Sequence, residues 1–191
     1  MLKLVGGVIA AGSRAVARPL MQVGTIPVIR RIVITYRQVG IFPIVVVCDS
    51  GNEALRNDLS GQGVIFLEND HGDQPELFDS AKIGLAYLAN KCERVVFTPV
   101  NTPMFSPMTL LRLMSVSALV VSPSYEGRGG HPIIVDSSII SGILSFDGLG
   151  GLKEALEKYR DDHIWVPVQD QGVLSSVHQK DELEQQAVKH N

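Results

Sequence analysis

Cysteine and long hydrophobic runs are both scarce in this sequence. The 191 residues include only two cysteines, Cys48 and Cys92, which lie far apart and lack the spacing of a metal-binding pair. The sequence therefore predicts reduced thiols and no disulfide framework. No apolar run reaches the roughly eighteen residues that a membrane helix needs, and the apolar N-terminus lacks the charged lead-in of a signal peptide. These absences favour a cytoplasmic protein that makes no contact with a membrane.

Charge is also sparse, and the two signs nearly balance. Lys and Arg number 17 against 20 Asp and Glu, which gives a formal net charge of −3. Without a basic surplus to neutralise a phosphate backbone, a dedicated nucleic-acid binder is not expected. Hydrophobic residues make up 45% of the chain, which is enough for a packed core. No repeat, low-complexity tract or linker divides the sequence, so we expect one domain over residues 1–191.

Apolar runs alternate with segments of helical periodicity along the chain. Continuous runs rich in Val and Ile predict strands buried on both faces, at residues 2–10, 43–48, 64–67, 95–99, 118–122, 132–135 and 164–168. Helices are predicted at residues 28–39, 52–59, 77–88, 107–114 with Ser106 as N-cap, 138–144, 151–159 and 181–189. This succession predicts an α/β fold, a three-layer doubly wound sandwich with a mostly parallel, Rossmann-like sheet.

The loop after the first predicted strand is the first candidate site, because open sheets of this kind bind ligands beyond the carboxyl ends of their strands. Small residues let backbone N–H groups approach an anion closely, and arginines add bidentate positive charge. The residues concerned are Ala10, Ala11, Gly12, Ser13, Arg14 and Arg18. The stretch lacks the Walker A and dinucleotide-binding glycine patterns. A plain strand-to-helix turn with exposed arginines is the alternative interpretation.

Polar residues after later strands supply further candidates. Asn101 follows the strand predicted at 95–99, where it could face a metal ion or a phosphate, or could serve as a turn asparagine. Ser80, with Asp79 and Lys82, stands near the start of the helix predicted at 77–88. A helix N-terminus there could receive a phosphate, or Ser80 could be a cap.

A glycine-rich segment, Gly127-Arg-Gly-Gly-His-Pro132, is predicted to form a flexible loop with cationic and hydrogen-bonding capacity. Taken alone, His131 fits an anchor of this loop better than a general base. The chain shows no nucleophile elbow and no His-Glu-x-x-His zinc motif. The residues by themselves indicate an α/β domain with a candidate phosphate-binding first loop.

Several of these stretches together resemble the MobA-like nucleotidyltransferases. The matching motifs are Val8-Ile-Ala-Ala-Gly12, Arg18-Pro-Leu-Met-Gln-Val-Gly24, Ser80-Ala-Lys-Ile-Gly-Leu85, Pro99-Val-Asn-Thr-Pro103, Tyr125-Glu-Gly-Arg-Gly-Gly-His-Pro132 and Phe146-Asp-Gly-Leu-Gly-Gly-Leu152. The motif that ends at Pro132 is the most specific of them. The resemblance is greatest to the molybdenum cofactor cytidylyltransferases and the hydroxylase-maturation proteins related to them.

The resemblance implies a reaction in which CMP, or less readily GMP, passes from Mg²⁺-bound CTP or GTP to the phosphate of a molybdopterin-type cofactor. It implies that the first loop and Ser80 bind the nucleotide, and that Arg14 and Arg18 are catalytic, offsetting charge as pyrophosphate leaves. It puts Asn101 at the metal position. The acceptor-binding residues that it implies are Arg128, Gly130, His131 and Pro132. A molybdenum hydroxylase would then be a protein partner.

The sequence departs from the family at several charged positions. Arg18 stands where the family has Lys, and Asn101 stands where it has the metal-binding Asp, so Mg²⁺ would receive a neutral oxygen there. His178 lies near the family's second acidic position and is a poor ligand for a hard cation. The carboxylates that could substitute are Asp49, Asp70, Asp73 and Asp170.

Two alternatives therefore stay open. One is a catalytically degenerate protein that binds the cofactor or acts as a chaperone for a molybdenum hydroxylase. The other is a sugar-phosphate nucleotidyltransferase, because the same fold serves both kinds of acceptor.

Overall fold

The structure is a computed structural model, and it describes residues 4–12, 19–70 and 77–176. Its strands are β1 (Val5–Ala10), β2 (Gln22–Val23), β3 (Ile26–Pro27), β4 (Ile44–Cys48), β5 (Val64–Glu68), β6 (Arg94–Pro99), β7 (Val120–Tyr125), β8 (Arg128–Gly129), β9 (Ile133–Asp136) and β10 (His163–Pro167). Its helices are α1 (Val28–Gln38), α2 (Glu53–Asp58), α3 (Leu77–Leu88), α4 (Pro107–Met114), α5 (Ile140–Leu144) and α6 (Gly151–Glu157). Short 3₁₀ helices are η1 (Ser137–Ile139), η2 (Arg160–Asp162) and η3 (Gln171–Leu174).

Eight strands form one mixed sheet in the order β10-β7-β9-β6-β1-β4-β5, with β8 paired to β7. β1 runs parallel to both β4 and β6, while β9 lies antiparallel between β6 and β7. The chain winds from β1 through β4 to β5 and then returns to β6 on the opposite side of β1. This reversal makes the carboxyl ends of β1 and β6 the switch point of a doubly wound fold. The predicted α/β sandwich with a mostly parallel sheet is confirmed.

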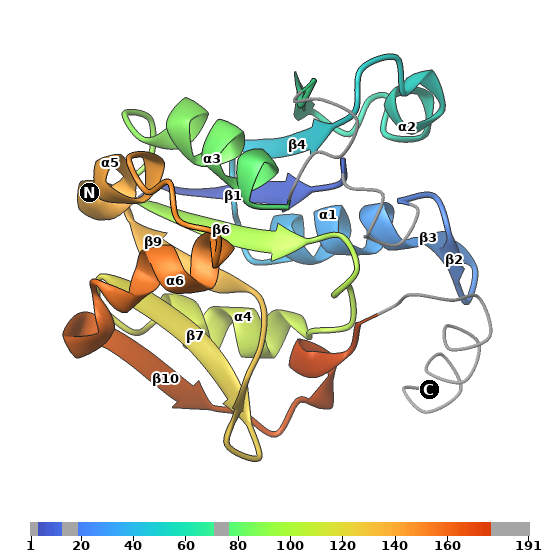
Figure 1. Ribbon diagram of the computed structural model, residues 1–191. Coiled ribbons are helices and arrows are strands. Elements are labelled where there is room, and N and C mark those ends of the chain that lie inside the picture. The colour runs from blue at the N-terminus through green and yellow to red at the C-terminus, as the bar shows by residue number, and fades with distance from the viewer. Residues whose placement is uncertain (1–3, 13–18, 71–76, 177–191) are drawn as a thin grey trace.

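Helices cover both faces of the sheet (Figure 1). One core cluster packs α1, α2 and α4 against one face, and a second packs α3, α5 and α6 against the other. Because strands such as β4 are buried on both faces, all five of its residues are apolar. Gly84 lets α3 lie directly on β1, since a Cβ atom at that position would overlap the side chain of Val8.

Local sequence rules account for the start of α4. Ser106 begins α4 as predicted: its hydroxyl accepts a hydrogen bond from the Thr109 N–H at 3.1 Å, and Pro107 occupies the first turn. The predicted helix over 181–189 lies outside the described residues. Among the residues that are described, no helix is long and apolar enough to cross a membrane.

The segment predicted as a flexible loop after β7 is instead a β-hairpin. β8 pairs with β7 through Tyr125 and Arg128, and the two residues between them, Glu126 and Gly127, both have positive φ. Two consecutive positive φ values are typical of the tight turns that match strand twist. Glu126 carries no glycine-like signal for such a turn, which is why the sequence did not reveal it.

Candidate functional site

The carboxyl ends of three parallel strands meet at the switch point. The Ala11 N–H donates to the Val47 carbonyl at 2.7 Å, which joins the end of β1 to β4. The Val100 N–H donates to the Ala10 carbonyl at 3.0 Å, which joins β6 to β1. The predicted nucleotide residues Ala10–Gly12 therefore lie between the β4 end and Asn101.

Gly12 is required here by close approach of the next strand. A Cβ atom at this position would lie 2.9 Å from the carbonyl carbon of Cys48 and 3.0 Å from the Asp49 backbone nitrogen. Its φ lies outside the left-handed region, so this position needs glycine for its small size and not for its conformational freedom. Ala10 and Ala11 are likewise buried, and the end of β1 offers mainly its backbone to a ligand.

Asn101 lies partly exposed beyond β6, beside the end of β1. Its amide nitrogen donates to the Ser176 hydroxyl at 3.1 Å, and its carbonyl oxygen receives a long hydrogen bond, 3.4 Å, from the Thr102 hydroxyl. The neighbouring turn is closed by the backbone, since the Thr102 N–H donates to the Pro99 carbonyl. The structure thus gives Asn101 a contact with a segment 75 residues away, beyond what a turn asparagine needs.

Ser80 lies inside the first turns of α3 and not at its cap, because the helix begins at Leu77. Its side chain is fully buried and its hydroxyl accepts a hydrogen bond from the Asn69 side-chain amide at 2.9 Å. Asn69 is itself buried directly after β5, and its backbone N–H donates to the Cys48 carbonyl. Ser80 therefore fastens the start of α3 to the end of β5 in this conformation.

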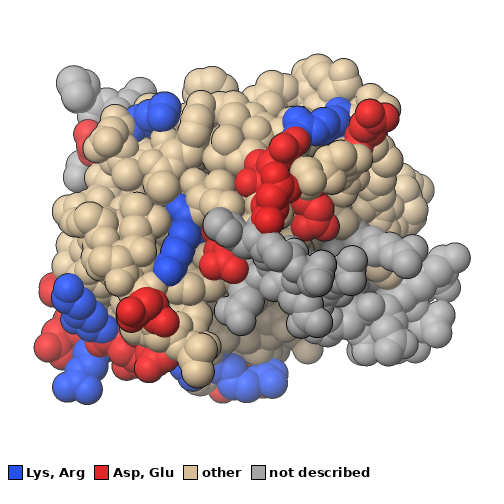
Figure 2. Space-filling model, turned by 45° about the horizontal axis from the view of Figure 1, so that its top comes forward, with Lys and Arg blue, Asp and Glu red and all other residues tan. Residues whose placement is uncertain are grey.

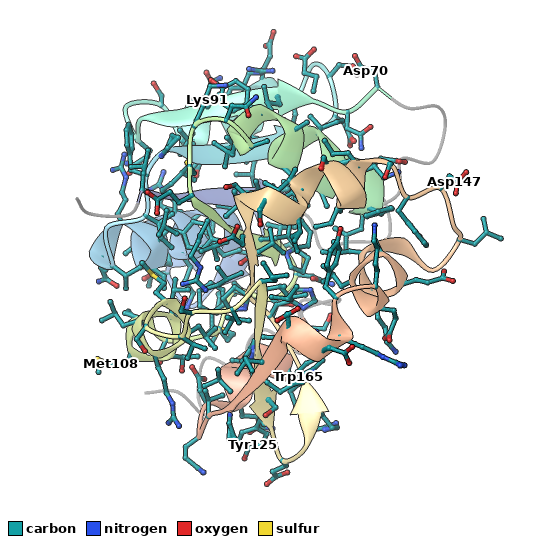
Figure 3. All side chains as sticks on the ribbon, turned by 90° about the vertical axis from the view of Figure 1, so that its left-hand side faces the viewer. Asp70, Lys91, Met108, Tyr125, Asp147 and Trp165 are labelled. Atoms are coloured by element: carbon teal, nitrogen blue, oxygen red, sulfur yellow. The ribbon has the colours of Figure 1, made fainter. Side chains whose placement is uncertain are left out.

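Lys82, which follows Ser80 on α3, is engaged elsewhere. Its ammonium group donates to the Phe146 carbonyl and lies 4.5 Å from the centre of the Phe78 ring. The Phe78 and Phe146 rings pack edge to face, with their centroids 6.0 Å apart. Lys82 thereby holds the loop that carries Asp147 (Figure 3), and it is not a free cation for a phosphate.

The predicted acceptor residues lie on the other side of β6. Arg128 and Gly129 form β8, with Arg128 exposed, whereas Pro132 is buried immediately before β9. The His131 ring packs against Phe97 of β6 with its centroid 6.2 Å away, and burial lowers the pKa of this imidazole to about 4. His131 is therefore neutral at pH 7 and supplies no charge to an acceptor.

The described part of the nucleotide side carries exposed acidic groups. Asp49 follows β4, Glu68 ends β5 and Asp70 lies two residues further on; all three are exposed, and Glu68 pairs with Arg56 at 2.6 Å. Acidic side chains gather on this face next to residues that are not described (Figure 2). Within residues 4–12, 19–70 and 77–176, no group of three or more His, Cys, Asp or Glu could hold a metal ion.

Several residues of the sequence predictions lie outside the described residues, among them Ser13, Arg14, Arg18 and His178. Asp73, one of the carboxylates considered as a substitute metal ligand, lies outside them too.

Asp170, another of those carboxylates, is engaged by hydrogen-bond donors of the protein. One oxygen accepts from the Ser106 N–H at 2.8 Å and the Thr109 hydroxyl at 2.6 Å, and the other accepts from the Gly172 N–H at 2.9 Å. Its role is the one that sequence reasoning missed. The only local signal is the Asp-x-Gly spacing, which allows the contact between Asp170 and Gly172.

Comparison with known proteins adds to this geometry. A model of the MobA-like NTP transferase domain matches residues 7–164 of the chain. A search of curated protein sequences found no match.

Solved structures with the same fold are numerous. A nucleotidyl transferase from Methanothermobacter thermautotroptrophicus superposes with a TM-score of 0.82 at 19% identity, covering 98% of this chain and 99% of its own. Rv0371c from Mycobacterium tuberculosis H37Rv gives a TM-score of 0.74 at 17% identity, covering 88% and 89%. The 4-diphosphocytidyl-2C-methyl-D-erythritol synthase from Anaerococcus prevotii gives 0.78 at 15% identity, covering 99% and 97%.

Proposed function

Because the chain belongs to the MobA-like NTP transferase family, we propose that it binds a nucleoside triphosphate at the carboxyl ends of β1, β4 and β6 and transfers the nucleotidyl group to a phosphate-bearing acceptor. The observation that carries the proposal is the junction at the switch point. There the backbone of Ala10–Gly12 lies between the end of β4 and Asn101. Backbone groups at such a strand end suit a polyphosphate, which needs close approach.

We propose cytosine as the base of the bound nucleotide, with guanine as the second choice. The support comes from relatives of the same fold: the synthase from Anaerococcus prevotii is named for a diphosphocytidyl product, and a CMP:2-keto-3-deoxy-manno-octonic acid synthetase was solved with CTP. The latter superposes with a TM-score of 0.71 at 12% identity. The sequence resemblance to cytidylyltransferases points to the same base.

A divalent cation fits this site if the protein and the nucleotide phosphates coordinate it together. Asn101 can offer one neutral oxygen, because among the described residues its carbonyl receives only the long hydrogen bond from Thr102. Mg²⁺ keeps several waters and binds through one or two protein groups plus substrate phosphates, so a single amide oxygen is compatible with it. The metal would draw charge from the phosphates as the nucleotidyl group is transferred. A manganese complex of Rv0371c exists within the same fold.

Arg14 and Arg18 are the cations that we propose for the triphosphate. They follow Gly12 in the sequence, and the described neighbours on this side, Asp49 and Asp70, are acidic. Phosphoryl-type transfer requires positive charge near the leaving pyrophosphate more than covalent chemistry. The chain's own contribution is thus to hold the triphosphate by backbone groups and arginines while the acceptor phosphate attacks.

The acceptor that we propose is the phosphate of a molybdopterin-type cofactor, at the hairpin side of β6. The support is the Gly-His-Pro sequence that ends at Pro132, which resembles that of the cofactor cytidylyltransferases. Arg128 is exposed on β8 and can meet a phosphate, whereas His131 acts by packing.

Two alternative functions are each favoured by a specific observation. The names of the relatives that act on methylerythritol and octonic acid substrates favour a sugar-type acceptor. The neutral Asn101 at the family's acidic position favours a degenerate protein that binds cofactor and serves a molybdenum hydroxylase.

Calorimetric titration of CTP and GTP, with and without Mg²⁺, tests the nucleotide part of the proposal. We expect Mg²⁺-dependent binding of CTP, and about tenfold or greater weakening in Arg14→Ala, since a charge-assisted contact is worth about 1.5–3 kcal/mol. The matched control is Arg112→Ala, an exposed residue in the last turn of α4. Equal affinities of Arg14→Ala and wild type would refute the phosphate-loop assignment.

A second arm separates an enzyme from a binding protein. Asn101→Asp adds a charged oxygen at the metal position, and in an impaired enzyme it should strengthen Mg²⁺-dependent nucleotide binding and raise pyrophosphate release. No gain in either quantity would favour the degenerate protein. Pyrophosphate release with a panel of pterin and sugar phosphates then identifies the acceptor class.

Binding of the acceptor can be followed optically. Trp165, the single tryptophan of the chain, packs so closely on Gly129 that a Cβ atom there would overlap its ring. Trp165 and Tyr125 lie at the same end of the molecule (Figure 3). A ligand at Arg128 should therefore change the fluorescence of Trp165.

A further inference from the structure

The segment of residues 170–176, which we call the strap, contacts both sides of the candidate site. On the nucleotide side, its Ser176 hydroxyl accepts a hydrogen bond from the side-chain amide of Asn101 at 3.1 Å. On the acceptor side, its Val173 carbonyl accepts a hydrogen bond from the backbone N–H of His131 at 2.9 Å. The strap, which includes η3, lies beside the loop that follows β6 (Figure 1).

The strap packs against the loops that follow β6 and β8 so closely that its contacts leave no room for a Cβ atom. A Cβ atom at Gly130 would overlap the Val173 carbonyl, and one at Gly172 would overlap the Met104 carbonyl. The Val173 side chain is fully buried in the core. Backbone-to-backbone contact of this kind leaves the loops after β6 and β8 little freedom while the strap stays in place.

Asp170 fastens the strap to the start of α4. Its carboxylate accepts from the Ser106 N–H at 2.8 Å, the Thr109 hydroxyl at 2.6 Å and the Gly172 N–H at 2.9 Å. Ser106 and Thr109 form the N-terminal turn of α4, where the helix dipole favours a negative charge. These partners are 64 and 61 residues away along the chain, so Asp170 joins segments that nothing local would bring together.

We propose that Asp170 is a positioning residue, which fixes the strap on α4 and thereby holds Asn101 and the Gly130–His131 backbone in place for the nucleotide and the acceptor. The proposal rests on the proposed function for what the two sides bind. It gives Asp170 a role different from that of a substitute metal ligand, because its oxygens receive protein N–H and O–H donors.

Hydrogen exchange in the full-length protein tests the strap without any ligand. Asp170→Asn removes the charge and turns one acceptor into a donor, and Thr109→Val removes one donor to the carboxylate. In both variants we expect the His131 and Thr102 amides to exchange about tenfold faster, the loss typical of a charge-assisted hydrogen bond. Thr109→Ser keeps the hydroxyl and should return the wild-type rates. The matched control is Asp162→Asn. Asp162 is an exposed residue of η2, which precedes the amino end of β10, whereas the strap follows the carboxyl end of that strand.

The pattern of exchange distinguishes positioning from general stabilisation. Amides of β4 should keep their wild-type rates, because the main contacts of η3, which forms part of the strap, with strands of the sheet are with β7 and β8. Acceleration of β4 and His131 by the same factor would overturn the proposal, as would unchanged rates at His131 in Asp170→Asn.

Calorimetry on the same variants links the strap to the proposed function. Mg²⁺-dependent CTP affinity should fall about tenfold in Asp170→Asn and recover in Thr109→Ser relative to Thr109→Val. Full affinity in a variant whose strap is loosened would overturn the positioning role. A wild-type protein that binds no nucleotide would refute the proposed function instead, and the exchange data would still decide whether Asp170 fixes the strap.

Discussion

The two sides of the carboxyl edge are built by different physics. On the nucleotide side, Ala10–Gly12 is held by parallel strand pairing and by a glycine that touches the backbone of the next strand. On the acceptor side, the loop after β8 is held by the hydrogen bond that the His131 N–H donates to the Val173 carbonyl of the strap, and by the close approach of Gly130 to that carbonyl. Both sides are closely packed on backbone atoms, but only the acceptor side holds a buried imidazole, that of His131, whose protonation depends on pH. The two sides should therefore fail under different perturbations.

Gly12→Ala is expected to have the largest effect and to act on the nucleotide side. The added methyl group would lie 2.9 Å from a backbone carbon of Cys48, and backbone cannot rotate away as a side chain can. Overpacking of this kind costs about 1–3 kcal/mol, and we expect the upper end of that range because two of the three nearest atoms, in Cys48 and Asp49, belong to the main chain. Urea unfolding gives the loss of stability, and CTP titration should show weakened binding.

The matched control for this variant is Ser50→Ala, at an exposed position just after Asp49. Stability equal to wild type in both variants would mean that β4 can move away from β1. The contrast between a rigid nucleotide side and a responsive acceptor side would then be wrong.

Acidification is the next largest perturbation, and it acts on the acceptor side. Burial lowers the pKa of His131 from 6.5 to about 4 in the folded protein, so between these values the unfolded chain binds a proton that the folded protein does not. The stability from this group is full above pH 6.5 and is lost as pH falls toward 4. The expected loss is on the order of 2–3 kcal/mol.

Unfolding midpoints of wild type and His131→Gln between pH 7 and pH 4 measure the contribution of His131 to the free energy of unfolding. The variant should be less stable at pH 7 and lose less stability on acidification. His163, whose pKa is lowered by burial against an opposing effect of Glu157, contributes in the same direction in both proteins and cancels in the difference. Parallel pH curves for the two proteins would show that His131 titrates normally.

The same contrast explains how far the sequence could be read. The pattern predicted the strands of the nucleotide side well, because buried parallel strands are continuous apolar runs: the strand predicted at 43–48 appears as Ile44–Cys48. The acceptor side was predicted less well. Its hairpin depends on a positive φ at Glu126, and its strap depends on hydrogen bonds between Asp170 and α4 across more than sixty residues of chain. No local periodicity encodes contacts of that range.

A smaller effect is expected beneath β6, the strand that separates the two sides. The Tyr36 and Thr98 hydroxyls form a 2.6 Å hydrogen bond and both side chains are fully buried. Tyr36→Phe leaves the Thr98 hydroxyl without this partner, which costs about 1–2 kcal/mol. The double variant Tyr36→Phe with Thr98→Val replaces both polar groups and should recover part of the loss. A double-mutant cycle by urea unfolding measures the coupling, and strictly additive losses would show that the bond contributes nothing.

The smallest effect is expected at the rim of the nucleotide side, where Arg56 pairs with Glu68 at 2.6 Å. Both side chains are more than a third exposed, at 36% and 45%, so solvent and salt screen their attraction. Glu68→Gln should therefore change stability by about 0.5 kcal/mol or less, and by still less at high salt. Arg56 also lies 5.0 Å from the Phe66 ring centre, a contact that Glu68→Gln leaves intact, so Arg56→Met should cost more than Glu68→Gln. Urea unfolding at low and high salt distinguishes the two terms. A salt-insensitive loss above about 1 kcal/mol in Glu68→Gln would mean that charge organises this rim as strongly as hydrogen bonds organise the acceptor side.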